Sequence, residues 1–174
     1  MSLNANLEPL DFFIAEDQVN MQELMKSMLM SLGVVNIRMA KDGSDAFAQL
    51  LTKPSDIIFV DWLMKPTSGI DLVRLIRGSE NPAISNMPVI MVTANCEQEC
   101  VKEAMDAGAT DYLLKPISPQ LLQLRIEKIF PSKQDLSSPN TELGNDEDDT
   151  FWSHVTEIVP SQKQVLLKKF STQE

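Results

Sequence analysis

Short apolar runs alternate with longer stretches of helical period between residues 10 and 130 of this chain. Each run has the length of a β-strand, and the apolar residues of the stretch that follows recur every three or four positions. This alternation is typical of repeated βα units around a parallel sheet. The pattern predicts strands over residues 11–15, 36–39, 56–61, 88–93 and 111–114, and helices over residues 19–32, 43–51, 69–77, 98–107 and 119–129.

Local signals agree with this periodicity. The third and fourth predicted strands are apolar almost throughout, as expected when helices cover both faces of a sheet. Gly33 and Gly108 stand where a helix C-cap needs a positive φ. Ser118 precedes Pro119 in the order of an N-cap and a first helical residue. The helix ends are therefore consistent with the predicted elements.

The sulfur-containing residues indicate a packed core and a reduced protein. Met21, Met25 and Met28 fall on one face of the first predicted helix, where we interpret them as core packing, with a methionine-rich docking surface as the alternative. The two cysteines, Cys96 and Cys100, are too few for a disulfide framework. A reduced, cytoplasmic protein is expected, and a metal or redox pair at these cysteines is the less favoured reading.

Length and charge narrow the class of protein. The chain has 174 residues, enough for one domain of about 130 residues with an appendage. Its net charge of −10 argues against direct binding to nucleic acid or to an anionic membrane, since both rely on Lys and Arg. No apolar stretch reaches the roughly 18 residues of a membrane span. Partners are therefore expected to be proteins.

The last part of the chain has a different composition. Residues 131–174 are rich in Pro, Ser, Asn and acidic residues, with a cluster of acids over 142–149. Phe151 and Trp152 begin an apolar pattern of helical spacing, which we interpret as anchors on the domain or, alternatively, as a partner site. We divide the chain into an extension over 1–9, a domain over 10–130, and an acidic linker with a short helical or disordered tail. This tail is too small and too acidic for a DNA-binding output domain.

Chemically useful residues close four of the predicted strands. Glu16 and Asp17 follow the first strand, Asp61 ends the third, Thr93 ends the fourth and Lys115 follows the fifth. The carboxyl ends of parallel strands form one edge where ligands bind, so these side chains are expected to meet. Three carboxylates at one place repel each other unless a cation shares the site. Oxygen ligands of this kind suit Mg²⁺, with Asp17 and Asp61 as direct ligands and Glu16 acting through water.

The neighbouring groups suit a phosphoryl group. Lys115 supplies a mobile positive charge and Thr93 a hydroxyl, and both can contact its peripheral oxygens. Asp61 lies at the end of the central strand and can serve as a carboxylate nucleophile that yields an aspartyl phosphate. The structural alternative is that Glu16 and Asp17 cap the first helix, Asp61 caps a loop and Lys115 is a solvated cation.

With these residues in place, the chain resembles the CheY-like receiver domains of two-component response regulators over residues 10–130. The fold that this resemblance implies is α/β: a doubly wound, flavodoxin-like (βα)5 domain with a five-stranded parallel sheet in the order 2-1-3-4-5. The matching segments are Ala15-Glu16-Asp17, Lys41-Asp42-Gly43 with Ala46, Asp61-Trp62-Leu63-Met64 with Ser68-Gly69, Met91-Val92-Thr93-Ala94, Ala107-Gly108-Ala109 and Asp111-Tyr112-Leu113-Leu114-Lys115-Pro116.

The resemblance implies a role for each matching residue. Asp61 corresponds to the phosphoacceptor, Glu16 and Asp17 to the acidic pair that organises Mg²⁺, and the Leu63 backbone carbonyl to a further metal ligand. Thr93 and Lys115 match the pair that contacts the phosphoryl group.

Two further positions match residues that shape the switch. Tyr112 matches an aromatic residue that turns inward when the threonine hydroxyl moves, although a tyrosine packed on a sheet edge needs no such role. Pro116 matches a proline that follows the lysine through a cis bond.

Two departures from the family pattern concern the loop after Asp61. Lys65 stands where the family often has proline and Pro66 follows it, so a loop of different shape is expected. Leu63 is apolar where polar residues in some members help to place the attacking water. We therefore hypothesise slow hydrolysis of the phosphorylated form, tuned also by Asn95.

The leading function is a phosphorelay switch rather than an enzyme. In this reading a sensor histidine kinase or a histidine phosphotransfer protein donates the phosphoryl group to Asp61, and an effector protein binds the phosphorylated form. A homodimer is a further possible partner state. The resemblance implies that the kinase docks at the first helix and the loop 114–118.

A receiver-fold scaffold that works without phosphorylation is the first alternative. The second is a Mg²⁺-dependent aspartyl phosphatase, but such enzymes carry an acid where this chain has Leu63. His154, the single histidine, cannot form a histidine-rich site.

Overall fold

Five parallel strands form a single sheet in the computed structural model, which describes residues 7–94 and 98–130. The strand order is β2-β1-β3-β4-β5, as expected from the sequence. The strands are β1 Asp11–Ala15, β2 Asn36–Ala40, β3 Ile57–Asp61, β4 Val89–Thr93 and β5 Asp111–Leu114. The helices are α1 Val19–Ser31, α2 Gly43–Thr52, α3 Gly69–Arg77, α4 Pro82–Ser85, α5 Gln98–Ala107 and α6 Pro119–Ile129.

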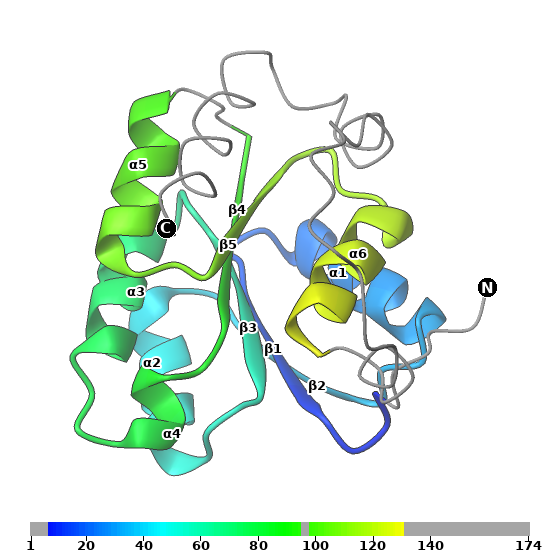
Figure 1. Cartoon of the computed structure of the whole chain (residues 1–174), viewed down its shortest axis with the longest axis horizontal. Coiled ribbons are helices and arrows are strands. Elements are labelled where there is room, and N and C mark those ends of the chain that lie inside the picture. Colours follow the sequence, from blue (N-terminus) through cyan, green and yellow to red (C-terminus); the bar gives the residue numbers. More distant parts are fainter. Residues whose placement is uncertain (1–6, 95–97, 131–174) are drawn as a thin grey trace, which may run out of the picture.

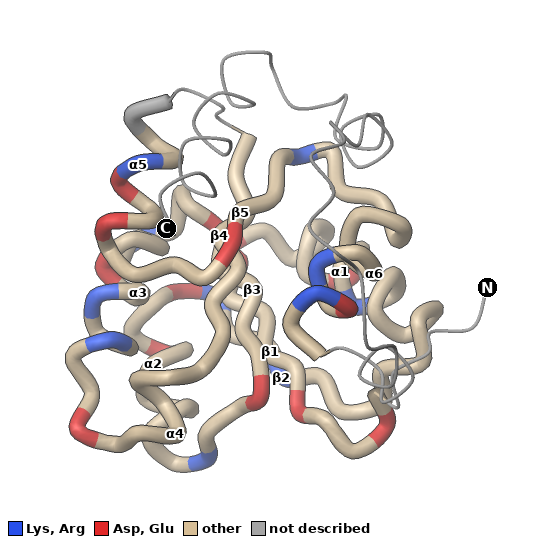
Figure 2. The backbone as a smooth tube through the Cα atoms, in the orientation of Figure 1, with Lys and Arg blue, Asp and Glu red and all other residues tan. Residues whose placement is uncertain are grey.

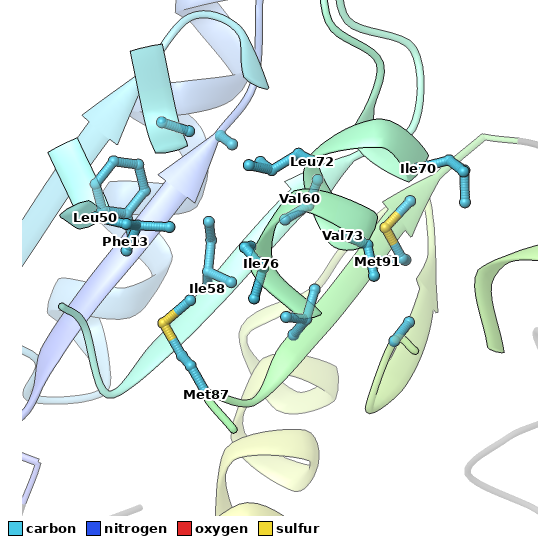
Figure 3. Packing of buried hydrophobic residues seen from close by; sticks show 14 of the residues in the cluster. Phe13, Leu50, Ile58, Val60, Ile70, Leu72, Val73, Ile76, Met87 and Met91 are labelled. Carbon is cyan, nitrogen blue, oxygen red and sulfur yellow. The ribbon is translucent and has the colours of Figure 1, made fainter. Parts of the chain in front are cut away.

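Helices cover both faces of the sheet. Figure 1 shows α2, α3, α4 and α5 on one side and α1 with α6 on the other. The central strands β1, β3 and β4 are buried at every position, because their alternate side chains enter two separate cores. In the first core, Phe13 of β1 and Ile58 and Val60 of β3 lie with residues of α3 (Figure 3). The second core lies beneath α1 and α6 and contains Phe12 and Phe59.

The predicted elements are confirmed, with differences at their ends. β3 begins at Ile57 rather than at residue 56, because the Asp56 carboxylate accepts a hydrogen bond from the Asp11 amide at 2.7 Å. β4 begins one residue after Pro88, which has no N–H to offer a neighbouring strand. The prediction missed the short helix α4. Asn81 caps it and Pro82 is its first residue, a signal that was present in the sequence.

The helix-end and core interpretations also agree with the structure. Gly33 and Gly108 have positive φ angles of 92° and 102°. The Ser118 side chain accepts from the Leu121 amide as an N-cap. Met25 is buried, and Met21 and Met28 pack against the same core, so these methionines fill space beneath α1.

An ion-pair network fastens the edge of the sheet opposite to the predicted site. Asp11, at the start of β1, pairs with Arg38 of β2 at 2.9 Å and with Lys53, and accepts a hydrogen bond from Ser55 at 2.7 Å. Burial raises the pKa of Asp11, but the hydrogen bonds from Lys53, Ser55 and Arg38 outweigh this and hold the pKa below its usual value. The network therefore stabilises the fold when Asp11 is ionised.

Surface charge is mixed on the described part of the domain. Figure 2 shows Lys and Arg interspersed with Asp and Glu along α3 and α5. Arg74 of α3 pairs with Asp71 of the same helix and with Glu103 of α5. Within residues 7–94 and 98–130, no helix combines the length and the apolar character that crossing a membrane requires. Cys100 lies in α5, whereas Cys96 and the predicted tail over 131–174 lie outside the described residues.

Candidate functional site

The register of the sheet brings the predicted site residues to one edge. Ala15 pairs with Val60, so the acids that follow β1 lie beside Asp61 at the end of β3. Asp61 pairs with Val92, and Thr93 pairs with Leu114, so the ends of β4 and β5 reach the same edge. The strand order changes direction between β1 and β3, which is where ligands bind in open parallel sheets.

Three carboxylates converge at this edge. Glu16, Asp17 and Asp61 each place a carboxylate oxygen within 4.8 Å of the others. Glu16 is 1 % exposed and Asp61 is 6 % exposed, whereas Asp17 is open to solvent. Buried carboxylates so close together repel each other strongly, because the medium between them screens weakly. The cluster therefore has the donor type and the charge to hold a divalent cation, with Asp17 as its exposed member.

Lys115 bridges the two buried carboxylates. Its Nζ lies 2.8 Å from Glu16 Oε2 and 2.6 Å from Asp61 Oδ1. Burial lowers the pKa of Lys115, but the hydrogen bonds and charges of Asp61 and Glu16 outweigh this and raise it above its ordinary value. Lys115 is thus a protonated cation within reach of Asp61, as its place in the sequence predicts.

The pKa of Glu16 is raised as well, which disfavours its ionised form. Burial raises the pKa of Glu16, and the negative charge of Asp61 adds to the rise. The hydrogen bond from Lys115 opposes these effects without cancelling them. A second positive charge at the site would therefore favour the ionised form of Glu16.

Both oxygens of Asp61 have hydrogen-bond donors. Oδ1 accepts from Lys115, and Oδ2 accepts from the Leu63 amide at 2.8 Å. The Leu63 side chain points outward and is 73 % exposed. The loop after β3 thus orients the Asp61 carboxylate through its backbone, while an apolar side chain stands at the rim.

This loop is fastened to the ends of two helices. The Gly69 amide donates to the Trp62 carbonyl at 3.1 Å, which closes the loop at the start of α3. The Thr67 hydroxyl lies 2.6 Å from the Ser44 hydroxyl of α2. The bond between Lys65 and Pro66 is cis, which the sequence did not predict.

The remaining predicted residues take positions around the acidic cluster. Thr93 is buried at the end of β4, and its carbonyl accepts a hydrogen bond from the Lys115 amide at 2.8 Å. The bond between Lys115 and Pro116 is cis, as the resemblance implies. Tyr112 is half-buried on the edge strand β5 and packs against the first core. Its role as a switch stays a prediction, and Asn95 lies outside the described residues.

Sequence reasoning missed Gln22, a buried polar residue next to the acidic pair. Its side-chain amide donates to the carbonyls of Glu16 and Ala40. On the helical pattern it is merely a polar position in α1, so periodicity gave no signal for it. Glu16 Oε1 also accepts from the Gln18 amide at 3.2 Å, so part of the capping alternative is present beside the carboxylate cluster.

A parallel α/β domain with a cluster of acids and a lysine at the strand ends has known relatives. The response regulator receiver domain family matches residues 12–127. The chain belongs to this family and has the receiver fold of two-component signalling proteins. It is 38 % identical to the chemotaxis protein CheY of Pseudomonas aeruginosa over 117 residues, 67 % of this chain and 93 % of the relative. It is 35 % identical to CheY-3 of Vibrio cholerae over 128 residues, 74 % of this chain and 95 % of the relative.

Solved structures share the architecture. A putative response regulator from Chloroflexus aurantiacus has a TM-score of 0.65 and 29 % identity, over 70 % of this chain and 98 % of the other. The receiver domain of a Pseudomonas aeruginosa sensor histidine kinase has a TM-score of 0.63 and 29 % identity, over 68 % of this chain and 95 % of the other. That structure is described with a magnesium ion coordinated in its active site cleft.

Proposed function

We propose that this protein is a phosphorylation switch that accepts a phosphoryl group on Asp61 in a Mg²⁺-dependent reaction. One observation carries the proposal: three carboxylates and Lys115 converge at the end of β3, with both Asp61 oxygens held by donors. Phosphoryl transfer needs mainly alignment and neutralisation of charge, and these groups supply both.

The residues fit a divalent cation. The carboxylates of Glu16, Asp17 and Asp61 are all oxygen donors, which suits Mg²⁺. Together with Lys115 they carry a net charge of −2 when all are ionised, from three negative groups and one positive group. A bound Mg²⁺ would balance this charge and hold an oxygen of an incoming phosphoryl group. The Leu63 carbonyl is a further expected ligand from the resemblance.

Asp61 is the expected nucleophile. One of its carboxylate oxygens forms a bond to phosphorus while the bond between phosphorus and an imidazole nitrogen of the donor histidine breaks. The bonding pair remains on the imidazole, which then takes up a proton, and the product is an aspartyl phosphate. Lys115 already contacts Asp61 Oδ1 and can follow the charge onto the phosphoryl oxygens. The buried Thr93 offers a hydroxyl at the neighbouring strand end.

The proposed output is a change in protein contacts rather than turnover of a substrate. A phosphoryl group on Asp61 would bias an equilibrium that includes Thr93 and Tyr112, and a partner protein would read the result. The proposed donors are a sensor histidine kinase or a histidine phosphotransfer protein. The start of α1 and the loop 114–118 flank the site, and Val19 is an exposed apolar residue there. The cytoplasm is the compartment we propose for this exchange.

Acetyl phosphate provides a direct test without the cognate kinase. The full chain, incubated with acetyl phosphate and Mg²⁺, should gain one phosphoryl group by intact mass spectrometry. Asp61→Asn should gain none, and excess EDTA should abolish the gain in the wild type. A wild-type chain that stays unmodified would favour the scaffold that works without phosphorylation.

A further inference from the structure

Gln22 forms a buried contact that fastens the acidic pair to the neighbouring strand. It is 4 % exposed, although glutamine is usually a surface residue. Its Nε2 donates to the Glu16 carbonyl at 2.7 Å and to the Ala40 carbonyl at 2.9 Å. The Ala40 carbonyl also accepts from the Glu16 amide at 3.1 Å. Gln22 therefore closes a ring of hydrogen bonds between the end of β2 and the backbone of Glu16.

The held carbonyl helps to set the backbone from which the Asp17 side chain projects. The Glu16 carbonyl belongs to the peptide unit that joins Glu16 to Asp17, and a peptide unit is rigid and planar. Fixing its oxygen therefore fixes the plane from which Asp17 projects. Within residues 7–94 and 98–130 the Asp17 side chain makes no hydrogen bond or ion pair of its own. Among these hydrogen bonds, only those to the backbone therefore help to place Asp17.

The N-terminus of α1 lacks a side-chain cap. The N-cap residue Gln18 makes no side-chain capping bond, unlike the Asp42, Ser68 and Ser118 caps of α2, α3 and α6. Instead, the Glu16 carboxylate accepts from the Gln18 amide, and the Gln22 side chain ties the start of α1 to the Glu16 carbonyl.

We propose that Gln22 is a positioning residue for the acidic pair, setting the affinity of the site for Mg²⁺ by holding the Glu16–Asp17 peptide. It touches neither the cation nor the phosphoryl group. This inference rests on the proposed function, because it requires that the cluster bind Mg²⁺. Residues that orient the ligands of a metal typically change its affinity by about 10- to 100-fold when they are replaced.

Gln22→Met tests the inference, because methionine has a similar length but no donor. Mg²⁺ is titrated into the full chain and followed by the fluorescence of Trp62, the residue after Asp61. Trp152→Phe in every variant removes the second tryptophan. A local signal is needed because the acids over 142–149 also attract the cation. We expect a Kd about tenfold weaker for Gln22→Met.

Gln49→Met is the matched control. Gln49 also donates its amide to a carbonyl of β2, that of Met39 at 3.3 Å, but it does not contact Glu16. Its replacement should leave the Kd unchanged even if it lowers the unfolding midpoint. A purely structural role for Gln22 would instead move the unfolding midpoint in both variants and the Kd in neither.

One more variant keeps the test decisive. Gln22→Asn keeps an amide that is too short to reach both carbonyls, and it replaces Gln22→Met in the comparison should that variant not fold.

The outcomes separate the two proposals. Asp61→Asn serves as the control that lacks one of the expected Mg²⁺ ligands. If the Trp62 fluorescence of the wild type responded to Mg²⁺ no more than that of Asp61→Asn, both the proposed function and the inference would be refuted. A wild-type response that Gln22→Met or Gln22→Asn leaves unchanged would refute the inference alone. Equal weakening by Gln22→Met and Gln49→Met would also refute it.

Discussion

Gly69, the first residue of α3, packs against the backbone of Asp61, and its replacement by alanine tests how strictly the nucleophile must be placed. A Cβ at this position would lie 2.1 Å from the Asp61 carbonyl oxygen and 3.0 Å from its carbonyl carbon. A carbon and an oxygen normally approach to roughly 3.3 Å. Both Asp61 atoms belong to the backbone, so no side-chain rotation relieves the overlap. The start of α3 and the end of β3 must therefore separate by about 1 Å.

A displacement of this size should mainly lower the rate at which Asp61 is phosphorylated. A misplacement of about 1 Å at reacting groups costs about 100-fold, so we expect acetyl phosphate to modify Gly69→Ala about 100 times more slowly than wild type. The assay is the time course of the intact mass at saturating Mg²⁺, under conditions where circular dichroism shows a folded protein.

Gly78→Ala makes the same change at the other end of α3. Its Cβ would lie 3.3 Å from the Arg74 carbonyl oxygen, a contact that a small shift relieves. This control should be modified at nearly the wild-type rate. If a folded Gly69→Ala protein were modified as fast as Gly78→Ala, the reasoning that the close packing of α3 places Asp61 would be refuted.

Three other substitutions have measurable consequences. Asp11→Asn should lower the free energy of unfolding by about 2 kcal/mol at neutral pH, as measured by urea denaturation. Folding lowers the pKa of Asp11, so the difference in unfolding free energy between wild type and Asp11→Asn should persist above about pH 4. It should shrink as the pH falls through the lowered pKa. A difference that grew on acidification would contradict this reasoning. Lys115→Met should lower the unfolding free energy in EDTA by about 3 kcal/mol, and Mg²⁺ should restore more stability than it adds to wild type. Equal Mg²⁺ stabilisation of both would argue against mutual repulsion of the carboxylates. Leu63→Asn should shorten the lifetime of the phosphorylated form after removal of acetyl phosphate, and an unchanged lifetime would discard the hypothesis about this position.

The sequence predicted the elements and the edge on which the site lies, because both follow from periodicity. Asp61 and Lys115 close apolar runs, and parallel strands bring such ends together whatever the details of packing. The contacts between Lys115 and the carboxylates of Glu16 and Asp61 then follow from the strand order.

The features that sequence reasoning missed depend on tertiary packing. Gln22 is indistinguishable from an exposed glutamine until β2 is placed beside the start of α1. The close approach of Gly69 to Asp61 requires the path of the loop 62–68, which includes a cis bond before Pro66. Helix α4 has four residues, too few for a periodic pattern, although its Asn81 cap was readable.

The central claim is that Asp61 accepts a phosphoryl group with Mg²⁺. The most direct measurement is intact mass spectrometry of the full chain after incubation with acetyl phosphate and Mg²⁺, followed by mapping of the modified residue. We predict one added phosphoryl group on wild type, located at Asp61 and absent from Asp61→Asn and from samples with excess EDTA. An unmodified wild-type chain, or a phosphoryl group that persists in Asp61→Asn, would contradict the claim.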